Sequence, residues 1–150
     1  MTAPRHPLDS GVGAVMALDV GNRRVGVAVC DPSRTFVLPR ETYERRSLEL
    51  DAEHLGREAK SDGVKLLVVG LPINVDGSEG PQAHAARAYG IEMSTRTGLP
   101  YVLVDERYTS LEADESLRER FRDWRERKAR VDKGAAALIL QSFLEYGALP

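Results

Sequence analysis

VMALDVGNRRVGVAVC, at residues 15–30, is the stretch that decides the fold. It contains two short apolar runs, 15–20 and 25–30, on either side of the turn-forming letters GNRR. Such runs around a glycine-containing turn are typical of a β-hairpin. We expect a third strand at 36–38, where Pro39 favours the edge of the sheet because proline lacks an N–H for a second neighbouring strand.

The rest of the chain alternates between helical and strand patterns. Apolar residues recur at helical spacing in four segments, and two wholly apolar runs predict buried strands. The expected helices cover residues 48–59, 81–97, 113–124 and a final segment that starts at Asp132, and the expected strands cover 66–69 and 101–105. Three antiparallel strands followed by α–β units predict an α/β fold, with a mixed five-stranded sheet covered by helices on both faces.

Length and composition fit one domain in a reducing compartment. The chain has 150 residues, 42% of them hydrophobic, which suffices for one core. We expect residues 1–13 to form a flexible tail and residues 14–150 to form a single domain. Cys30 is the only cysteine, which excludes an internal disulfide, and no apolar run has membrane-spanning length, so we expect a cytoplasmic protein.

Asp19 is the most informative single residue, because it interrupts an otherwise apolar strand. An ionised carboxylate buried there without a partner would cost several kcal/mol. It therefore needs a cation. The candidates are a bound metal ion and an arginine of the following turn, Arg23 or Arg24.

Acids at two further positions could join the same site. Asp105 and Glu106 stand at the carboxyl end of a buried strand, where open α/β sheets bind ligands, and the pattern leaves open which of them faces the site. Asp132, at the expected start of the final helix, could serve only as its N-cap. It also lies four residues before Ala136 on the apolar side of that helix, so its side chain should point toward the sheet.

Carboxylates from two strands and one helix would form a site with oxygen ligands only. Such ligands suit Mg²⁺ or Mn²⁺ and not zinc, and two such ions could activate a water and stabilise the leaving oxygen of a phosphodiester. The histidines are not expected to compete for metal. His6 lies in the tail, and His54 and His84 lie on separate helices without a partner at metal-ligand spacing.

Basic and polar segments could contact a nucleic acid. The net charge of −2 hides a local charge of +4 at residues 118–130, where seven basic side chains accompany three acidic ones. This segment could bind phosphates or be a solvated helix face. The glycine-rich loop at 71–80 carries Asn74 and Ser78 just before a helix, and it could bind a phosphate or be a plain surface loop.

Four segments together resemble the YqgF (RuvX) family of Holliday junction resolvases and pre-16S rRNA processing nucleases. They are LDVGNRRVGVAVCD at 18–31, VVGLPINVDGSEG at 68–80, VDERYTSLEA at 104–113 and VDKGAAALILQSFL at 131–144. In the family's order and with similar spacing, they cover the domain from end to end. The chain departs from the family's common residues at Cys30, Val75 and Tyr108, and none of these departures removes an acid.

The resemblance implies an RNase H-like three-layer fold and a metal-dependent nuclease. It carries the family's catalytic and metal-binding acids onto Asp19, Glu106 and Asp132, and so favours Glu106 over Asp105. It also implies Mg²⁺ or Mn²⁺, as two ions, and a DNA or RNA substrate. The residues expected to border that substrate are Arg23, Arg24, Asn74, Ser78, Arg107 and Thr109.

Two other interpretations fit parts of the sequence. A non-catalytic RNA-binding module for ribosome assembly could use the basic helix around Trp124. The letters DVGNRRVG also resemble the first phosphate motif of actin-like ATPases, but those proteins need a second lobe, for which 150 residues leave no room. Among partners, a junction resolvase would need a homodimer, and rRNA processing would involve a ribosomal precursor particle. We expect no membrane partner.

Overall fold

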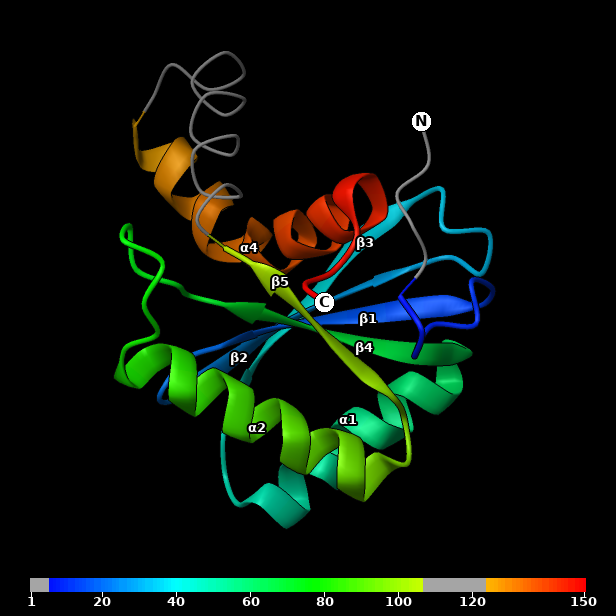
Figure 1. The fold of residues 1–150 in the computed structure, drawn as a ribbon. Coiled ribbons are helices and arrows are strands. Elements are labelled where there is room, and N and C mark those ends of the chain that lie inside the picture. Colours follow the sequence, from blue (N-terminus) through cyan, green and yellow to red (C-terminus); the bar gives the residue numbers. More distant parts are fainter. Residues whose placement is uncertain (1–5, 107–123) are drawn as a thin grey trace.

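The structure, a computed structural model, describes residues 6–106 and 124–150, and over 124–133 it describes only the backbone. A five-stranded mixed sheet lies at its centre, with the strand order β3-β2-β1-β4-β5 (Figure 1). The strands are β1 (Ala14–Val20), β2 (Arg24–Cys30), β3 (Val37–Glu44), β4 (Val64–Leu71) and β5 (Tyr101–Asp105). The first three are antiparallel, and β4 and β5 run parallel to β1, which confirms the predicted fold class.

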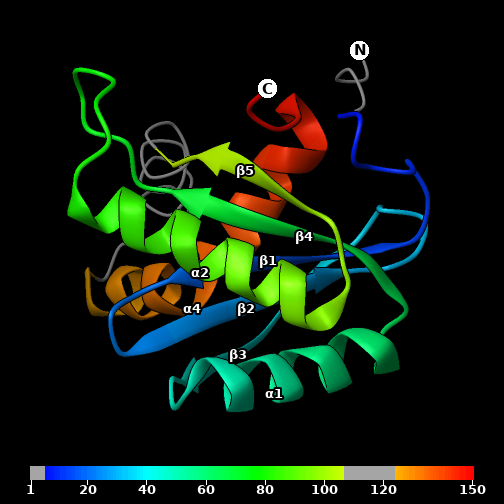
Figure 2. The same cartoon turned by 60° about the horizontal axis from the view of Figure 1, so that its bottom comes forward.

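Helices cover both faces of this sheet. On one face lie α1 (Leu48–Ser61) and α2 (Pro81–Thr97), and α4 (Trp124–Tyr146) lies on the other (Figures 1 and 2). The domain therefore has three layers, as the resemblance implied, with the sheet in the middle.

The ends of α1 and α2 follow from local sequence. The Ser47 hydroxyl accepts a hydrogen bond from the Leu50 N–H (3.1 Å), which satisfies one of the unpaired donors in the first turn of α1. Pro81 suits the first turn of α2, because its missing N–H would have no helical partner there. Gly98 ends α2 with a φ of 77°, a left-handed conformation that costs glycine little.

Side chains alternate along the strands between two cores. In β1, Met16 and Leu18 pack toward α1 and α2, whereas Val15 and Ala17 pack toward α4. The buried residues of α4 that cover the second core are Ala136, Ile139, Leu140 and Phe143. Because of this alternation, the position of a polar residue along a strand decides on which face of the sheet its side chain lies.

The edge strand β3 is longer than predicted. Its position at the edge agrees with the expectation from Pro39, which pairs with Ala28 next to an irregularity in the register. The strand does not stop near residue 38 but continues through Thr42 and Tyr43. A β-branched residue followed by an aromatic one favours extended backbone, which explains the extension.

The last helix begins earlier than predicted. It already includes Trp124, where the described segment begins, so the expectation that Asp132 opens it is wrong, and Asp132 lies inside α4. The reason is that residues 124–132 are rich in arginine, glutamate and lysine, which favour helix, and contain neither glycine nor proline. The helix predicted at 113–124 lies outside the described residues except for Trp124 itself.

Of the expected N-terminal tail at residues 1–13, the structure describes residues 6–13. Within it, the buried Asp9 carboxylate accepts two hydrogen bonds from the Arg34 guanidinium, at 2.7 and 2.8 Å. The division of the chain at residue 14 stays a prediction. In the part of the chain that the structure describes, no helix is both long and apolar enough to cross a membrane.

Candidate active site

Asp19 and Glu106 lie at the carboxyl ends of β1 and β5, on the same face of the sheet. Two residues before them in the chain, Ala17 and Val104 belong to the core beneath α4. Because side chains alternate along a strand, Asp19 and Glu106 face α4 as well, and Asp105 faces the other way. The strand pattern therefore favours Glu106 over Asp105, as the family resemblance does.

A side-chain hydrogen bond joins Asp19 and Glu106. Burial raises the pKa of Glu106, and the nearby charge of Asp19 and the hydrogen bond raise it further, to about 7. Burial also raises the pKa of Asp19, but the hydrogen bond lowers it, because Asp19 accepts this bond as a carboxylate. The two acids therefore hold one proton between them.

Because Gly70 has no side chain, the carboxylate of Glu106 can lie next to the Gly70 backbone. Gly70 lies in β4, the strand between β1 and β5, and a Cβ at this position would overlap Oε1 of Glu106 and lie 2.5 Å from Cδ1 of Ile139. Sequence reasoning missed this residue. The available signal is a glycine inside a wholly apolar strand, which often marks the close approach of another group.

The pair supplies carboxylate oxygens in a largely buried place, and this chemistry fits a divalent cation. Two neighbouring acids that share a proton cannot both be ionised without a positive charge beside them. A divalent cation can replace the proton and let both carboxylates ionise. Hard oxygen ligands suit Mg²⁺ or Mn²⁺, so Asp19 and Glu106 fit the metal that the family resemblance implies.

Asp132 lies one helical turn before Ala136 in α4. A Cβ on Gly26 would lie 3.7 Å from Cβ of Ala136 and 3.4 Å from Cβ of Asp19, so α4 passes close to Asp19 at Ala136. The backbone of Asp132 is thus one turn away from the pair. Its side chain lies outside the described part of the structure, and its convergence with the other two acids stays a prediction.

Arg23 is exposed in the turn between β1 and β2, and Arg24 is exposed at the first position of β2. Within residues 6–106, Asp19 has Glu106 as its hydrogen-bond partner and forms no ion pair with either arginine. Arg45 fixes the turn, because its N–H donates to the Arg23 carbonyl (2.8 Å) and its guanidinium to the Gly21 carbonyl (2.9 Å). The two arginines are therefore presented to solvent at an anchored turn and the start of the strand after it, and their contact with substrate stays a prediction.

Asn74 and Ser78 hold the loop between β4 and α2 together. The Asn74 N–H donates to the Ser78 carbonyl (2.9 Å), and its side-chain amide donates to the Ser78 hydroxyl (3.1 Å). The Asp76 carboxylate accepts a hydrogen bond from the Ser78 N–H (2.9 Å). These bonds order the loop and leave Val75 98% exposed. The predicted phosphate contact of the loop stays a prediction.

The remaining predicted substrate contacts cannot be placed. Arg107 and Thr109 belong to residues 107–123, which lie outside the described part of the chain. The basic segment 118–130 falls partly there and partly where only the backbone of α4 is described. Their contacts with a nucleic acid therefore stay predictions.

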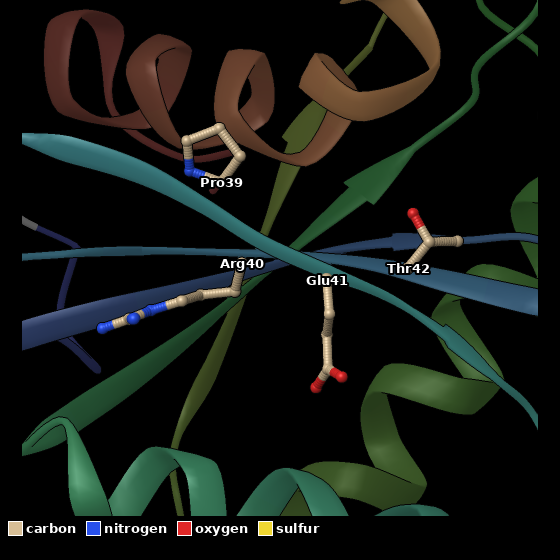
Figure 3. Close-up of a pocket in the computed structure, with 4 residues that line it drawn as sticks. All are labelled: Pro39, Arg40, Glu41 and Thr42. Atoms are coloured by element: carbon tan, nitrogen blue, oxygen red, sulfur yellow. The ribbon is translucent and has the colours of Figure 1, made fainter. Parts of the chain in front are cut away.

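A cluster on the other face corrects the prediction that no histidine has a partner at metal-ligand spacing. His54 and Glu58 lie one turn apart on α1, and Nε2 of His54 lies 2.5 Å from Oε1 of Glu41 on β3. The prediction is wrong because the i, i+4 spacing puts His54 and Glu58 on one side of the helix and the fold brings Glu41 to them. Glu41 also lines a hollow formed by residues 39–42 (Figure 3).

Comparison with known proteins places this chain in a family. The family described as "RuvX: Holliday junction resolvase" matches residues 13–146. The chain belongs to the RuvX family. This RuvX chain is 42% identical to a protein of Synechococcus elongatus, over 88% of this chain and 89% of that one, and 40% identical to one of Sinorhizobium medicae, over 91% and 82%. Both relatives carry the name pre-16S rRNA nuclease.

A solved structure is also similar to this RuvX chain. It is T. thermophilus RuvC in complex with a Holliday junction substrate, at 11% identity and a TM-score of 0.45, over 67% of this chain and 68% of that one. The family match rests on the sequence and covers all four segments that carry the resemblance. It confirms that the chain is a RuvX protein.

Proposed function

We propose that this RuvX protein is a metal-dependent nuclease that hydrolyses phosphodiester bonds in structured nucleic acid. The observation that carries the proposal is the largely buried pair of Asp19 and Glu106, in which two acids share one proton where two strands end. Such a pair stabilises the fold poorly, because burial disfavours both ionised forms. A divalent cation would remove this penalty and convert the pair into a metal site.

The proposed metal ligands are Asp19, Glu106 and Asp132, which would hold two Mg²⁺ or Mn²⁺ ions. When bound, these ions supply an activated water and stabilise the leaving oxygen of the phosphodiester. Glu106 releases its proton as the site is loaded, because an ion needs the carboxylate form. Gly70 keeps the space in which the Glu106 carboxylate reaches Asp19.

Three segments at the same edge of the sheet would orient the substrate. They are the turn after β1, the loop after β4 and the segment after β5, and all follow the carboxyl ends of parallel strands. Arginine can bind a phosphate with two parallel hydrogen bonds, which suits the anchored turn. The proposed substrate-binding residues are Arg23, Arg24, Asn74, Ser78, Arg107 and Thr109.

Precursor 16S rRNA and a four-way DNA junction are the two proposed substrates. The names of the relatives favour the rRNA, and the description of the family favours the junction. Symmetric junction cleavage would require two active sites and hence a homodimer. Processing of rRNA would require only one site with access to a ribosomal precursor particle.

A cleavage assay on both substrates, with and without Mg²⁺ or Mn²⁺, tests the proposal. We expect metal-dependent products from at least one substrate. Asp19→Asn should lower the cleavage rate by about 100-fold or more, because the amide keeps the shape of the side chain but loses the charge that binds the ion. The circular dichroism spectrum should not change.

Glu53→Gln is the matched control, since Glu53 is an exposed acid on α1 and should keep the full cleavage rate. Absence of metal-dependent cleavage of both substrates would contradict the proposal. RNA binding without cleavage, unchanged by Asp19→Asn, would instead favour the non-catalytic RNA-binding module.

A further inference from the structure

We propose that Glu41, His54 and Glu58 form a second metal site that binds Zn²⁺ and joins the edge strand β3 to α1. One ligand atom from each of these residues lies within 4.8 Å of those of the other two. This site is independent of the proposed nuclease function, because it shares no residue with the Asp19–Glu106 pair.

The three ligands reach the cluster from ordered backbone positions. His54 and Glu58 are four residues apart on α1, so their side chains lie on the same side of the helix. Glu41 lies in β3, and its carboxylate points from the strand toward the helix layer beneath (Figure 3). The His54 ring nitrogen Nε2 already lies 2.5 Å from Oε1 of Glu41.

Tyr43 fixes the imidazole ring of His54. The two rings are stacked, with centroids 4.2 Å apart and an angle of 10° between their planes. A ring held in this way loses little rotational freedom when its nitrogen binds an ion, which favours binding.

The charges of the cluster favour a divalent cation. Two carboxylates carry two negative charges, and a protonated His54 could neutralise only one of them, whereas a divalent ion neutralises both. Arg40, the neighbour of Glu41 in the chain, is engaged elsewhere, since its guanidinium donates to the Asp62 carboxylate (2.9 Å).

The ligand types and their exposure favour zinc. One imidazole nitrogen and two carboxylate oxygens suit Zn²⁺ better than Mg²⁺, which prefers oxygen ligands and retains its waters. The side chains of His54 and Glu41 are 23% and 36% exposed. An ion can therefore enter from solvent, and a water can complete its tetrahedral coordination.

The sheet separates this cluster from the candidate active site. Glu41 pairs with Val27, which belongs to the core beneath α1 and α2, so its side chain lies on that face. Asp19 and Glu106 face α4 on the opposite side. An ion held by the cluster would thus join β3 to α1 without touching the acid pair.

Calorimetric titration of the full chain with Zn²⁺ tests the proposal. The chain should carry Asp19→Asn and Glu106→Gln, so that ions bound by the other acid pair are not counted. We expect one Zn²⁺ per chain. Because Zn²⁺ binds only the folded state, the Tm should rise by roughly 5–10 °C when free Zn²⁺ exceeds its Kd about 100-fold.

Substitutions in the same background locate the bound ion. Glu58→Gln and His54→Gln should each weaken Zn²⁺ binding by about tenfold or more, whereas Glu53→Gln on the same helix should leave it unchanged. Thermal unfolding in EDTA checks that each variant folds. If His54→Gln does not fold, the Zn²⁺ affinity of Glu58→Gln alone tests the proposal. A titration that shows no saturable Zn²⁺ binding, or binding that Glu58→Gln does not weaken, would overturn the proposal and leave an ion pair of His54 with Glu41.

Discussion

Acidic side chains come together on both faces of the sheet, but they are largely buried on one face and partly exposed on the other. On the α4 face, Asp19 and Glu106 are largely buried, and burial with the charge of Asp19 raises the pKa of Glu106 to about 7. On the α1 face, Glu41 and Glu58 remain partly exposed beside His54. On the α4 face, burial thus gives the Asp19–Glu106 pair a proton that a metal ion must displace.

The largest expected effect is a loss of cleavage caused by a substitution that disturbs the α4 face and leaves the α1 face unchanged. Gly70→Ala should lower the cleavage rate by about 100-fold, because the new Cβ overlaps Glu106 and displaces its carboxylate from Asp19. Single-turnover cleavage of the better of the two substrates measures this. Zn²⁺ binding at the cluster on the α1 face should not change, since that cluster lies across the sheet.

Gly56→Ala is the matched control for this substitution. Its new Cβ meets only Cγ2 of Thr97, at an ordinary contact distance of 3.7 Å, so cleavage should proceed at the normal rate. A normal rate in Gly70→Ala as well would show that the close approach of Gly70 and Glu106 does not matter for activity.

A smaller effect is expected in the pH dependence of Mn²⁺ binding. A proton on Glu106 competes with the ion, so Mn²⁺ affinity should fall by about tenfold for each pH unit below a pKa of about 7. Calorimetry between pH 5.5 and 8 measures the affinity. Asp31→Asn should keep this profile, because hydrogen bonds from Ser33 and the Phe36 N–H hold the pKa of Asp31 at about 2. An affinity that is constant across this range would contradict the shared proton.

The smallest effect concerns stability without metal. The pKa of Glu106 is raised in the folded state from its ordinary value of 4.5 to about 7, so the folded protein binds this proton more tightly than the unfolded one. The stabilisation of the folded state by this proton on Glu106 is fully present below pH 4.5 and is lost as the pH rises through about 7.

Urea unfolding in EDTA at pH 5 and pH 8 measures this loss. Relative to Glu106→Gln, which cannot titrate, the wild type should lose on the order of 1–3 kcal/mol in free energy of unfolding between these two pH values. Equal pH dependence of the two proteins would mean that Glu106 does not hold the proton.

Local patterns predict most of the fold. The hairpin at 15–30 and the helix at 81–97 depend on apolar spacing, turn residues and the stop at Gly98, which are all read within a few residues of one another. The choice of Glu106 over Asp105 came from the family resemblance, because the sequence pattern left it open. In the structure, alternation along β5 puts Glu106 on the α4 face, in agreement with that choice.

Features that depend on the neighbours of a strand or helix could not be predicted in this way. The role of Gly70 requires β4 to lie between β1 and β5, and the contact of Glu41 with His54 requires β3 to lie next to α1. The helical conformation of residues 124–131 was missed for a different reason, because strong helix formers precede Asp132 without a break. Asp19 was therefore accessible from the strand pattern and Glu106 from the family resemblance, whereas the role of Gly70 depends on which strands lie beside it.

Anomalous X-ray scattering from crystals of the full chain grown with Mn²⁺ above pH 7 tests the central claim most directly. We predict a manganese peak within about 2.5 Å of carboxylate oxygens of both Asp19 and Glu106, with their mutual hydrogen bond broken. Crystals in which the two acids remain hydrogen-bonded to each other, and in which no manganese lies beside them, would contradict the assignment of this pair as the metal site.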